Sequence, residues 1–447
     1  MTFIKSAGAG FWGGVFLAVF LSGISLGGTE VPAEKRFGTD YLWYGINPYY
    51  KEENVAVARD YLKDLRLTSL RVDVHWHFLE PSRDRYDWRM TDLIVNTAPP
   101  GTDLLFTLYS SAGWAVKDLR WARRRSTSNA PRDFKDYHDF VFALAGRYKG
   151  KVKYYQIENE IYGAPNMFWA GSREDYLELL KTASSAIRKA DPAAKILPSS
   201  IALGDLEVVP MKKGPIPPKK RAQYEGAADF MREVFGKGCD YFDIADIHLY
   251  HTPDSIPGRL GWFKDFLSQH RCQKPIWVTE TGGLDSRAYK NAKDNRLQAE
   301  DLVKRFASAF GNGAQRVFWL AIHRSKDRVH PIFGEIRLTD DPYAKDKKPG
   351  YYTLKLLVEK IEGFTSVSGI PDGYRFVVGG RQVLIVWADR EKTVDLSPYL
   401  ATPGARITHI VTDLDSGRKP VYPPDEVRPS NAVPLSAIPV FVVESKD

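Results

Sequence analysis

Short apolar runs alternate with amphipathic helical stretches through most of this chain, from about residue 43 to residue 361. The runs are rich in the β-branched and aromatic residues that strands prefer. Helices are expected over residues 172–187, 295–310 and 351–361, and the first begins with Ser172-Arg173-Glu174-Asp175, which has the pattern of a capping box. Strands that alternate with helices indicate β/α units around a parallel sheet.

Eight of these runs are expected to be the strands of one sheet. In chain order they cover residues 44–47, 70–75, 104–108, 153–160, 196–198, 244–250, 276–280 and 317–322. Eight β/α repeats over roughly 300 residues predict a TIM barrel, in which functional residues lie at the carboxyl ends of the strands.

The chain of 447 residues is longer than one barrel requires, because such barrels typically take ~250 residues. After Gly363 the helical period disappears, and apolar strands alternate with glycine-containing turns. We therefore expect an (β/α)8 barrel over residues 38–362 and a small all-β sandwich over residues 363–447. The sandwich is expected to be a structural partner of the barrel, with a sugar-binding module as the alternative.

The N-terminal segment carries no charge between Ser6 and Thr29, and Lys5 precedes it. Most of residues 11–26 are apolar, and small residues follow, as in a secretory signal peptide. The uncharged span is also long enough for an uncleaved anchor, which takes ~20 residues. Its glycine content favours cleavage. We expect residues 1–29 to be a signal peptide or N-terminal anchor of a secreted or periplasmic protein.

The chain contains two cysteines, Cys239 and Cys272, which is too few for a disulfide scaffold or a zinc cluster. Each precedes a predicted strand, so both are expected near the amino end of the barrel. Export would allow a disulfide between them. Two separate buried thiols are the alternative.

Two predicted strands end on a glutamate, Glu160 after Gln-Ile-Glu-Asn and Glu280 after Ile-Trp-Val-Thr. Burying an unpaired charge is costly, so a carboxylate at the end of a buried strand needs an explanation. A single one is more simply a strand end in water. Two at equivalent places are the arrangement of glycoside hydrolysis by two carboxylates.

Hydrolysis with retention of configuration assigns a different role to each carboxyl. One donates a proton to the leaving oxygen, and the other attacks the anomeric carbon as an ionised nucleophile. We assign Glu160 as the acid/base, kept protonated by burial and a negative neighbour, and Glu280 as the nucleophile. Their carboxyl groups are expected ~5–5.5 Å apart, rather than the ~6.5–9.5 Å of inverting enzymes.

These residues resemble the signatures of clan A glycoside hydrolases, which have an Asn-Glu pair on strand four and a glutamate on strand seven. Arg71 on strand two, His248-Leu249-Tyr250 on strand six and Trp319 on strand eight match the same pattern. The segments 71–76, 80–81 and 86–88 are most similar to family 39. That family includes β-xylosidases, α-iduronidases and bacterial endoglycosidases of exopolysaccharides.

Two residues depart from the family pattern. Glu158 stands where a tryptophan is usual, and Ile161 replaces the common proline after the acid/base. On a regular strand Glu158 faces the same way as Glu160. It is then expected either to raise the pKa of Glu160 or to face a basic sugar.

Further substrate-binding roles follow for the remaining matched residues. Asn159 is expected to bind the hydroxyl next to the reacting carbon. Arg71 and Tyr250 are expected to hold Glu280, and His248 to bind a substrate hydroxyl. Trp319 is expected to form the platform under the cleaved sugar. The structural alternatives are an Arg71 paired with Asp73, a core histidine and a packed tryptophan.

The net charge of +8 is modest, but basic residues cluster after predicted strands three and five. They are Lys117, Arg120, Arg123, Arg124, Arg125, Lys212, Lys213, Lys219, Lys220 and Arg221. Basic loops over a cleft favour an anionic polysaccharide, with a neutral glycan as the alternative; no nucleic-acid motif accompanies them. Aromatic residues for a sugar cleft occur at the same end: Trp76, Tyr109, Trp114, Tyr162 and Trp169.

The sequence thus predicts a secreted, retaining, endo-acting glycoside hydrolase of a polysaccharide, with a bacterial-type exopolysaccharide favoured. We expect a monomer that requires no metal or cofactor. An exo-acting β-xylosidase or uronidase is the alternative in the same fold. A catalytically silent polysaccharide-binding protein is the alternative of another class, although retention of both Glu160 and Glu280 speaks against it.

Overall fold

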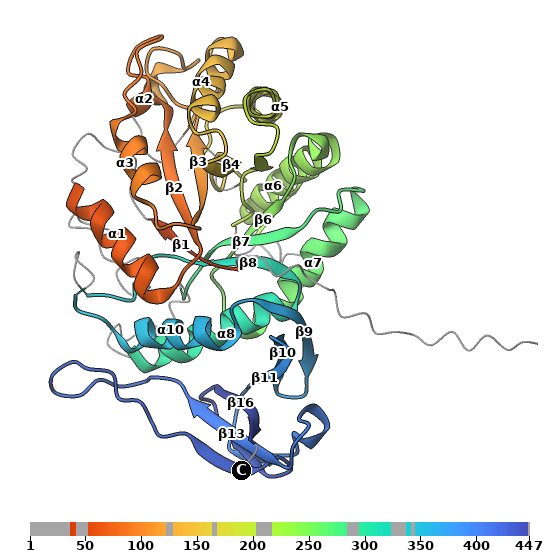
Figure 1. The fold of residues 1–447 in the computed structure, drawn as a ribbon. Helices are drawn as coiled ribbons and strands as arrows, with labels where there is room; N and C mark the ends of the chain where they lie inside the picture. The colour runs from red at the N-terminus through yellow and green to blue at the C-terminus, as the bar shows by residue number, and fades with distance from the viewer. Residues whose placement is uncertain are drawn as a thin grey trace, which may run out of the picture.

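A computed structural model describes residues 36–41, 52–121, 128–162, 168–202, 217–283, 295–322, 337–340 and 345–445. These residues form a barrel of parallel strands surrounded by helices, followed by an antiparallel β domain (Figure 1). The predicted fold class, a TIM barrel with a small C-terminal β-sandwich, is confirmed. Among the described helices, none combines the length and the apolar character needed to cross a membrane. Residues 1–29, the predicted signal or anchor, lie outside the described part.

Eight parallel strands make the barrel, in the spatial order β5-β4-β3-β2-β1-β8-β7-β6. Their bounds are β1 (Phe37–Tyr41), β2 (Ser69–His75), β3 (Asp103–Tyr109), β4 (Val152–Ile157), β5 (Lys195–Leu197), β6 (Ala245–Leu249), β7 (Ile276–Thr281) and β8 (Ala314–Trp319). Between β5 and β6 a single parallel bridge joins Ile201 to Ile247, and the His248 amide donates to the Ile201 carbonyl over 2.8 Å. The barrel is therefore nearly closed.

Seven of the eight predicted strands overlap strands of the structure. The first prediction, residues 44–47, lies outside the described residues, and the first barrel strand is instead β1. Its short sequence Phe-Gly-Thr-Asp-Tyr has one glycine and one aspartate, residues that strands usually avoid. Gly38 is required there because the ring of Phe318 occupies the space that a β-carbon would need.

Helices cover the outside of the barrel (Figure 1). They are α1 (Glu52–Leu65), α3 (Arg89–Thr97), α4 (Phe134–Arg147), α5 (Arg173–Ala190), α6 (Pro218–Lys237), α7 (Ile256–Gln269), α8 (Asn295–Gly311) and α10 (Pro349–Ile361), with a short α2 (Trp76–Leu79) after β2. The capping box that begins α5 is present, with Ser172 and Asp175 exchanging hydrogen bonds. The predicted apolar face of α5, including Tyr176 and Leu180, is buried.

The C-terminal domain is a six-stranded sheet with a separate two-stranded sheet packed on it. The order of the larger sheet is β14-β13-β16-β11-β10-β9, and the smaller sheet pairs β12 with β15. The bounds are β9 (Phe364–Ile370), β10 (Gly373–Val378), β11 (Arg381–Val386), β12 (Lys392–Val394), β13 (Gly404–His409), β14 (Glu426–Pro429), β15 (Val433–Leu435) and β16 (Val440–Ser445).

This sheet packs on the barrel through α8 and α10, as Figure 1 shows. The rings of Phe310 and Phe364 lie 5.1 Å apart, and the Asn312 amide donates to the Tyr374 hydroxyl over 3.0 Å. On α10, Thr353 donates to the Val411 carbonyl over 2.7 Å. The domain thus shares a buried interface with the barrel, as expected of a structural partner.

Cys239 and Cys272 form a disulfide, with their Cα atoms 5.7 Å apart. Cys239 begins the 3-10 helix η3 (Cys239–Tyr241) before β6, and Cys272 lies before β7. The bond therefore ties together the two segments that enter neighbouring strands at the amino end of the barrel. Of the two alternatives left open by the sequence, the structure has the bridge.

Candidate active site

Polar side chains fill the barrel interior toward the carboxyl ends of the strands. Successive residues of a strand alternate between the inside and the outside. On β4 the interior position after Tyr154 is Gln156, and on β6 the interior positions after Ile244 are Asp246 and His248. Tyr154 and Ile244 belong to a small apolar cluster with Phe318. The interior therefore changes from apolar to polar within one strand period.

A β-bulge in β7 brings two consecutive residues to the inside. Asp246 pairs with Trp277 and His248 pairs with Glu280, so the step from Trp277 to Glu280 takes one residue more than the step on β6. A bulge re-aims side chains in this way. Both Thr279 and Glu280 consequently contact His248, although a regular strand would point them to opposite faces.

Glu160 reaches the interior through an unusual backbone path. Strand β4 ends at Ile157, and Glu158 and Glu160 then adopt positive φ angles of 67° and 49°. Left-handed conformations are uncommon for residues other than glycine and occur preferentially at functional sites. Although Glu158 and Glu160 are two residues apart, their side chains therefore do not point to the same face as they would on a regular strand, and they lie in different environments.

Glu280 is held by three neighbours. Arg71 donates to one carboxylate oxygen and Tyr250 to the other, and Nδ1 of His248 lies 3.3 Å from Oε2. Burial alone would raise the pKa of Glu280, but the charges of His248 and Arg71 and the Tyr250 hydrogen bond outweigh it, so the pKa is lowered. An ionised carboxylate is the form that a nucleophile requires.

Glu160 has the opposite electrostatic bias. Its Oε1 lies 2.6 Å from Nδ1 of His248. Burial raises the pKa of Glu160 above its ordinary value, and the hydrogen bond from His248 offsets this only in part. A carboxyl with a raised pKa keeps its proton to higher pH and can act as a general acid.

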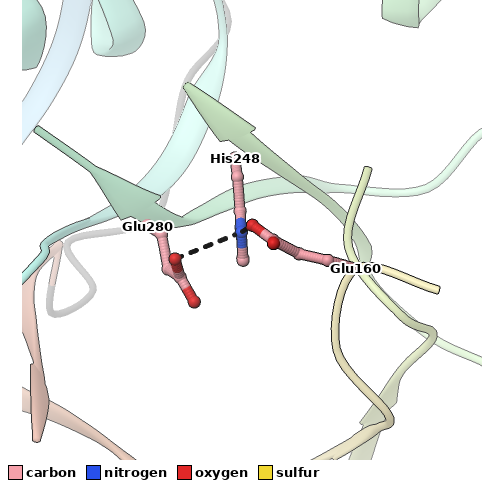
Figure 2. A group of neighbouring side chains, drawn as sticks. All are labelled: Glu160, His248 and Glu280. Atoms are coloured by element: carbon pink, nitrogen blue, oxygen red, sulfur yellow. Dashed lines mark hydrogen bonds and ion pairs between the residues drawn. The ribbon is translucent and has the colours of Figure 1, made fainter. Parts of the chain in front are cut away.

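Figure 2 shows Glu160, His248 and Glu280 pointing toward one another from the segment after β4, from β6 and from β7. One ligating atom of each lies within 4.8 Å of the others. This separation of the carboxylates agrees with the close spacing of retaining enzymes and not with the wider inverting spacing. The same set of groups can ligate a cation, but here Nδ1 of His248 is bonded to Glu160 and Nε2 to Thr279.

Arg71 joins the site to the barrel interior. Besides Glu280, its guanidinium donates to Asp40, to Gln156 over 2.9 Å and to Oδ1 of Asn159 over 2.6 Å. Because Oδ1 of Asn159 accepts from Arg71, the amide NH2 of Asn159 is oriented away from the guanidinium and can donate to a sugar hydroxyl. The predicted association of Arg71 with Glu280 and Asn159 is thus present in the structure.

Four interior residues of the site were not predicted: Asp40, Gln156, Asp246 and Thr279. Gln156 donates to Asp246, which also accepts from Thr279, and the chain of bonds continues from Thr279 to His248. Asp246 stands two residues before His248, so strand alternation alone could have identified it. Asp40 lies on the strand whose position was not predicted.

The structure contradicts the predicted substrate contact of both tryptophans. Trp319 pairs in register with Thr39 and Thr281, points outward and is fully buried beside Phe306 of α8. Trp76 is also fully buried, and its indole donates to Glu80 over 2.6 Å. The predicted platform fails because strand register, which the sequence does not reveal, sets the direction of Trp319.

Of the other aromatic residues expected to line a sugar cleft, most are also held by contacts within the protein. Tyr162 and Trp169 are buried in the core, and the Trp114 indole donates to the Glu80 carbonyl. Tyr109 lies at the end of β3, stacked on His75 with ring centroids 4.3 Å apart, and its hydroxyl donates to Asp73 over 3.4 Å. Of these residues, Tyr109 is placed among the interior polar groups.

The structure also contradicts the roles predicted for Glu158 and His248. Glu158 is fully buried away from Glu160, and its Oε1 accepts from the Ser110 amide over 2.7 Å, so it neither faces substrate nor tunes Glu160. Burial, opposed by bonds from Ser110 and Ser128, raises its pKa to about 7. The two ring nitrogens of His248 are bonded to Glu160 and Thr279, so neither is free to bind a sugar hydroxyl.

Most of the basic residues expected over the cleft lie outside the described residues: Arg123, Arg124, Arg125, Lys212, Lys213 and the side chains of Lys219 and Lys220. Lys117 is paired with Asp175 and Arg120 with Asp118. Arg221 is exposed on α6. The preference for an anionic glycan therefore stays a prediction.

The curated proteins that are similar in sequence match only part of this chain. No family model matches the chain. It is 28% identical to endo-1,4-beta-xylanase 2 of Claviceps purpurea over 138 residues, which are 30% of this chain and 40% of the relative. The chain spans about two fifths of the length of the curated relatives it matches.

Solved structures share the whole fold. A family 39 glycoside hydrolase from Bacteroides cellulosilyticus WH2 has a TM-score of 0.62 and 16% identity, covering 93% of this chain and 81% of its own. A family 39 β-xylosidase from Caulobacter crescentus has a TM-score of 0.58 and 16% identity, covering 92% and 97%. At this identity the likeness shows the fold, which agrees with the architecture of the family that the sequence resembles.

Proposed function

We propose that this protein is a retaining glycoside hydrolase that cleaves a polysaccharide by double displacement. The observation that carries the proposal is the pair of carboxylates. Glu160 and Glu280 face each other across His248 within 4.8 Å, and their pKa values are shifted in opposite directions. Two titratable groups with opposite shifts are the arrangement that separates an acid from a nucleophile.

In the first step Glu280 attacks the anomeric carbon while Glu160 gives its proton to the departing glycosidic oxygen. Arg71 and Tyr250 bond the carboxylate of Glu280 and thereby aim it. The Asn159 amide donates to the hydroxyl beside the reacting carbon, a contact that strengthens as charge develops on the sugar. The products of this step are a glycosyl ester on Glu280 and a released alcohol.

In the second step the ionised Glu160 removes a proton from water, and the water oxygen attacks the anomeric carbon. The ester bond to Glu280 breaks, and the sugar leaves with its original configuration. Glu160 is protonated again and Glu280 is ionised again, so both groups return to their starting states.

The substrate class is proposed from similarity and sequence together. The relative is named an endo-1,4-beta-xylanase and one structural neighbour a β-xylosidase, so a β-linked polysaccharide is the first substrate to test. The uncharged N-terminal segment supports action outside the cytoplasm, on an exopolysaccharide of bacterial type. An exo-acting β-xylosidase or uronidase is the alternative within the same mechanism.

The test is digestion of xylan and a panel of purified bacterial exopolysaccharides, with product sizes read by mass spectrometry. A ladder of oligosaccharides indicates endo action, and a single monosaccharide or disaccharide indicates exo action. Glu280→Gln should abolish turnover of every substrate, because the amide cannot form the ester. Glu362→Gln is the matched control, since it replaces a partly buried glutamate outside the site. Glycan binding without cleavage would instead support the polysaccharide-binding alternative.

Glu160→Ala should keep activity only on aryl glycosides with good leaving groups, and azide should restore the second step as a glycosyl azide of retained configuration. The pH profile of kcat/KM should be bell-shaped. Its acidic limb lies below the ordinary glutamate value of 4.5, where Glu280 becomes protonated, and its alkaline limb lies above 4.5, where Glu160 loses its proton. A profile with both limbs on one side of 4.5 would contradict the assignment.

A further inference from the structure

Behind His248, on the side of the ring away from Glu160, lies a pair of buried groups without a role in the mechanism above. Asp246 of β6 and Thr279 of β7 are both fully buried. Oδ1 of Asp246 accepts from the Thr279 amide over 3.1 Å, and Oδ2 accepts from the Thr279 hydroxyl over 2.6 Å. Nε2 of His248 lies 3.0 Å from the same hydroxyl oxygen.

The number of hydrogens in this chain of bonds determines the tautomer of His248. A threonine hydroxyl has one hydrogen, and Thr279 gives it to the Asp246 carboxylate. Toward His248 the hydroxyl oxygen therefore presents only a lone pair. Nε2 of His248 must carry a hydrogen to complete the bond, because two lone pairs facing each other would repel.

This tautomer has a direct consequence for Glu160, whose Oε1 lies 2.6 Å from Nδ1. With a hydrogen fixed on Nε2, one further proton between Nδ1 and Oε1 completes the bond, whichever of the two atoms holds it. Removing that proton leaves the lone pair of Nδ1 facing a carboxylate. If the ring could instead move its hydrogen to Nδ1, the ionised Glu160 would keep a donor and would lose its proton more readily.

We propose that Asp246 and Thr279 are positioning residues that hold a hydrogen on Nε2 of His248 and thereby keep the acid proton in the Glu160–His248 pair. The β7 bulge makes this possible, because it places the Thr279 hydroxyl on one side of the imidazole and the Glu280 carboxylate near the other. The catalytic consequence rests on the proposed function, whereas the tautomer is a property of the free protein.

Other charged and titratable groups also face this pair, and each contributes to its proton affinity. Around Glu160 and His248 they are Asp40 from β1, Arg71 from β2, Asp246 from β6, Tyr250 just after β6 and Glu280 from β7. Asp73 from β2 and Tyr109 from β3 interact in turn with Arg71 and Glu280. A variant that keeps every charge is therefore needed to isolate the tautomer. Thr279→Val removes only the hydroxyl, and Thr279→Ser restores it.

The first test is nitrogen NMR of the free protein labelled in histidine, with the His248 signals identified by their loss in His248→Gln. His248 in the native protein should show no neutral form with hydrogen on Nδ1 at any pH, and Thr279→Val should show that form at high pH. Thr279→Ser should behave as the native protein, and Thr353→Val controls for loss of an equally buried threonine hydroxyl. A neutral Nδ1–H form in the native protein would overturn the proposal.

The second test is the pH dependence of kcat/KM. In Thr279→Val the alkaline limb should move to lower pH by about one unit, and Thr279→Ser should restore it. An unmoved limb would overturn the catalytic part of the proposal. If the native protein cleaves no glycoside, the proposed function fails, and the NMR result still decides the tautomer separately.

Discussion

The two ends of the barrel interior each contain a buried arginine, but in opposite electrostatic settings. At the amino end Arg316 donates to Ser69 over 2.9 Å and to Asp103 over 3.1 Å, and its guanidinium lies over the rings of Tyr154 and Trp277. At the carboxyl end Arg71 bonds two carboxylates, Asp40 and Glu280.

The difference lies in the balance of charge. Asp103 is shared between Arg316 and Lys153, so cations match or exceed acids at the amino end. At the carboxyl end the acids outnumber the cations: Asp40, Asp73, Glu160, Asp246 and Glu280 face Arg71 and His248. Buried acids in excess cannot all ionise, and the pKa values of Asp40, Asp73, Asp246 and Glu160 are raised, with burial as the main cause. The charges are thus matched at the amino end, whereas the excess of buried acids at the carboxyl end makes each of these acids harder to ionise.

The largest effect is expected from a change at Arg71, which holds the carboxyl end together. Arg71→Met leaves Glu280 without its main fixed cation, so the nucleophile should become harder to ionise and poorly aimed. We expect kcat/KM to fall by about 10³-fold or more and the acidic limb of the pH profile to move upward. Steady-state kinetics across pH on protein shown to be folded measures both. Activity within tenfold of native would refute the special role of the carboxyl end.

Arg316→Met tests the other end with the same side-chain change. It should leave Asp103 with Lys153 as its remaining cation and open a gap between Tyr154 and Trp277. We expect a loss of roughly 3 kcal/mol of unfolding free energy, measured by urea denaturation, with kcat per folded molecule kept. A large fall in kcat at unchanged stability would show that the two ends are not functionally separate.

The disulfide at the amino end should likewise matter for stability alone. Cys239→Ser with Cys272→Ser opens a loop of 33 residues, and the lost restraint on the unfolded chain predicts about 3–4 kcal/mol of destabilisation. The double variant should melt at lower temperature with unchanged kinetics below its transition. Mass spectrometry of the unreduced protein, alkylated after denaturation because Cys272 is fully buried, supplies the control, since two labelled thiols would mean that no bridge forms.

Glu158 is a buried acid near the carboxyl end of the barrel but outside the reactive cluster. Its folded-state pKa of about 7 exceeds the ordinary 4.5, so the folded state binds more protons than the unfolded state between these values. Native stability should therefore fall by about 2 kcal/mol from pH 5 to pH 8 relative to Glu158→Gln. Denaturation curves at both pH values measure it. A parallel pH dependence in the two proteins would contradict the raised pKa, and kinetics should be unaffected.

The sequence by itself determined the repeating architecture and the chemical identity of the site. Apolar periodicity was sufficient for seven of the eight strands, because alternation and β-branched composition are local properties. Glu160 and Glu280 follow from strand ends, and Asn159, Arg71, His248 and Tyr250 follow from the resemblance to clan A glycoside hydrolases. The structure brings these six residues together. Strand β1 escaped prediction because its glycine and aspartate suit neither pattern.

The tertiary structure alone decided which way these side chains point. Strand register turned Trp319 outward, two left-handed residues separated Glu158 from Glu160, and one bulge placed Thr279 and Glu280 on the same side. The predicted directions of these side chains assumed regular strands in which every second residue faces the barrel interior, and each of these three features alters that pattern. The physical reason is that a bulge, a register and a positive φ are stabilised by contacts with neighbouring strands and loops, which are distant in sequence. The proposed hydrogen on Nε2 of His248 likewise depends on the register of β7 against β6.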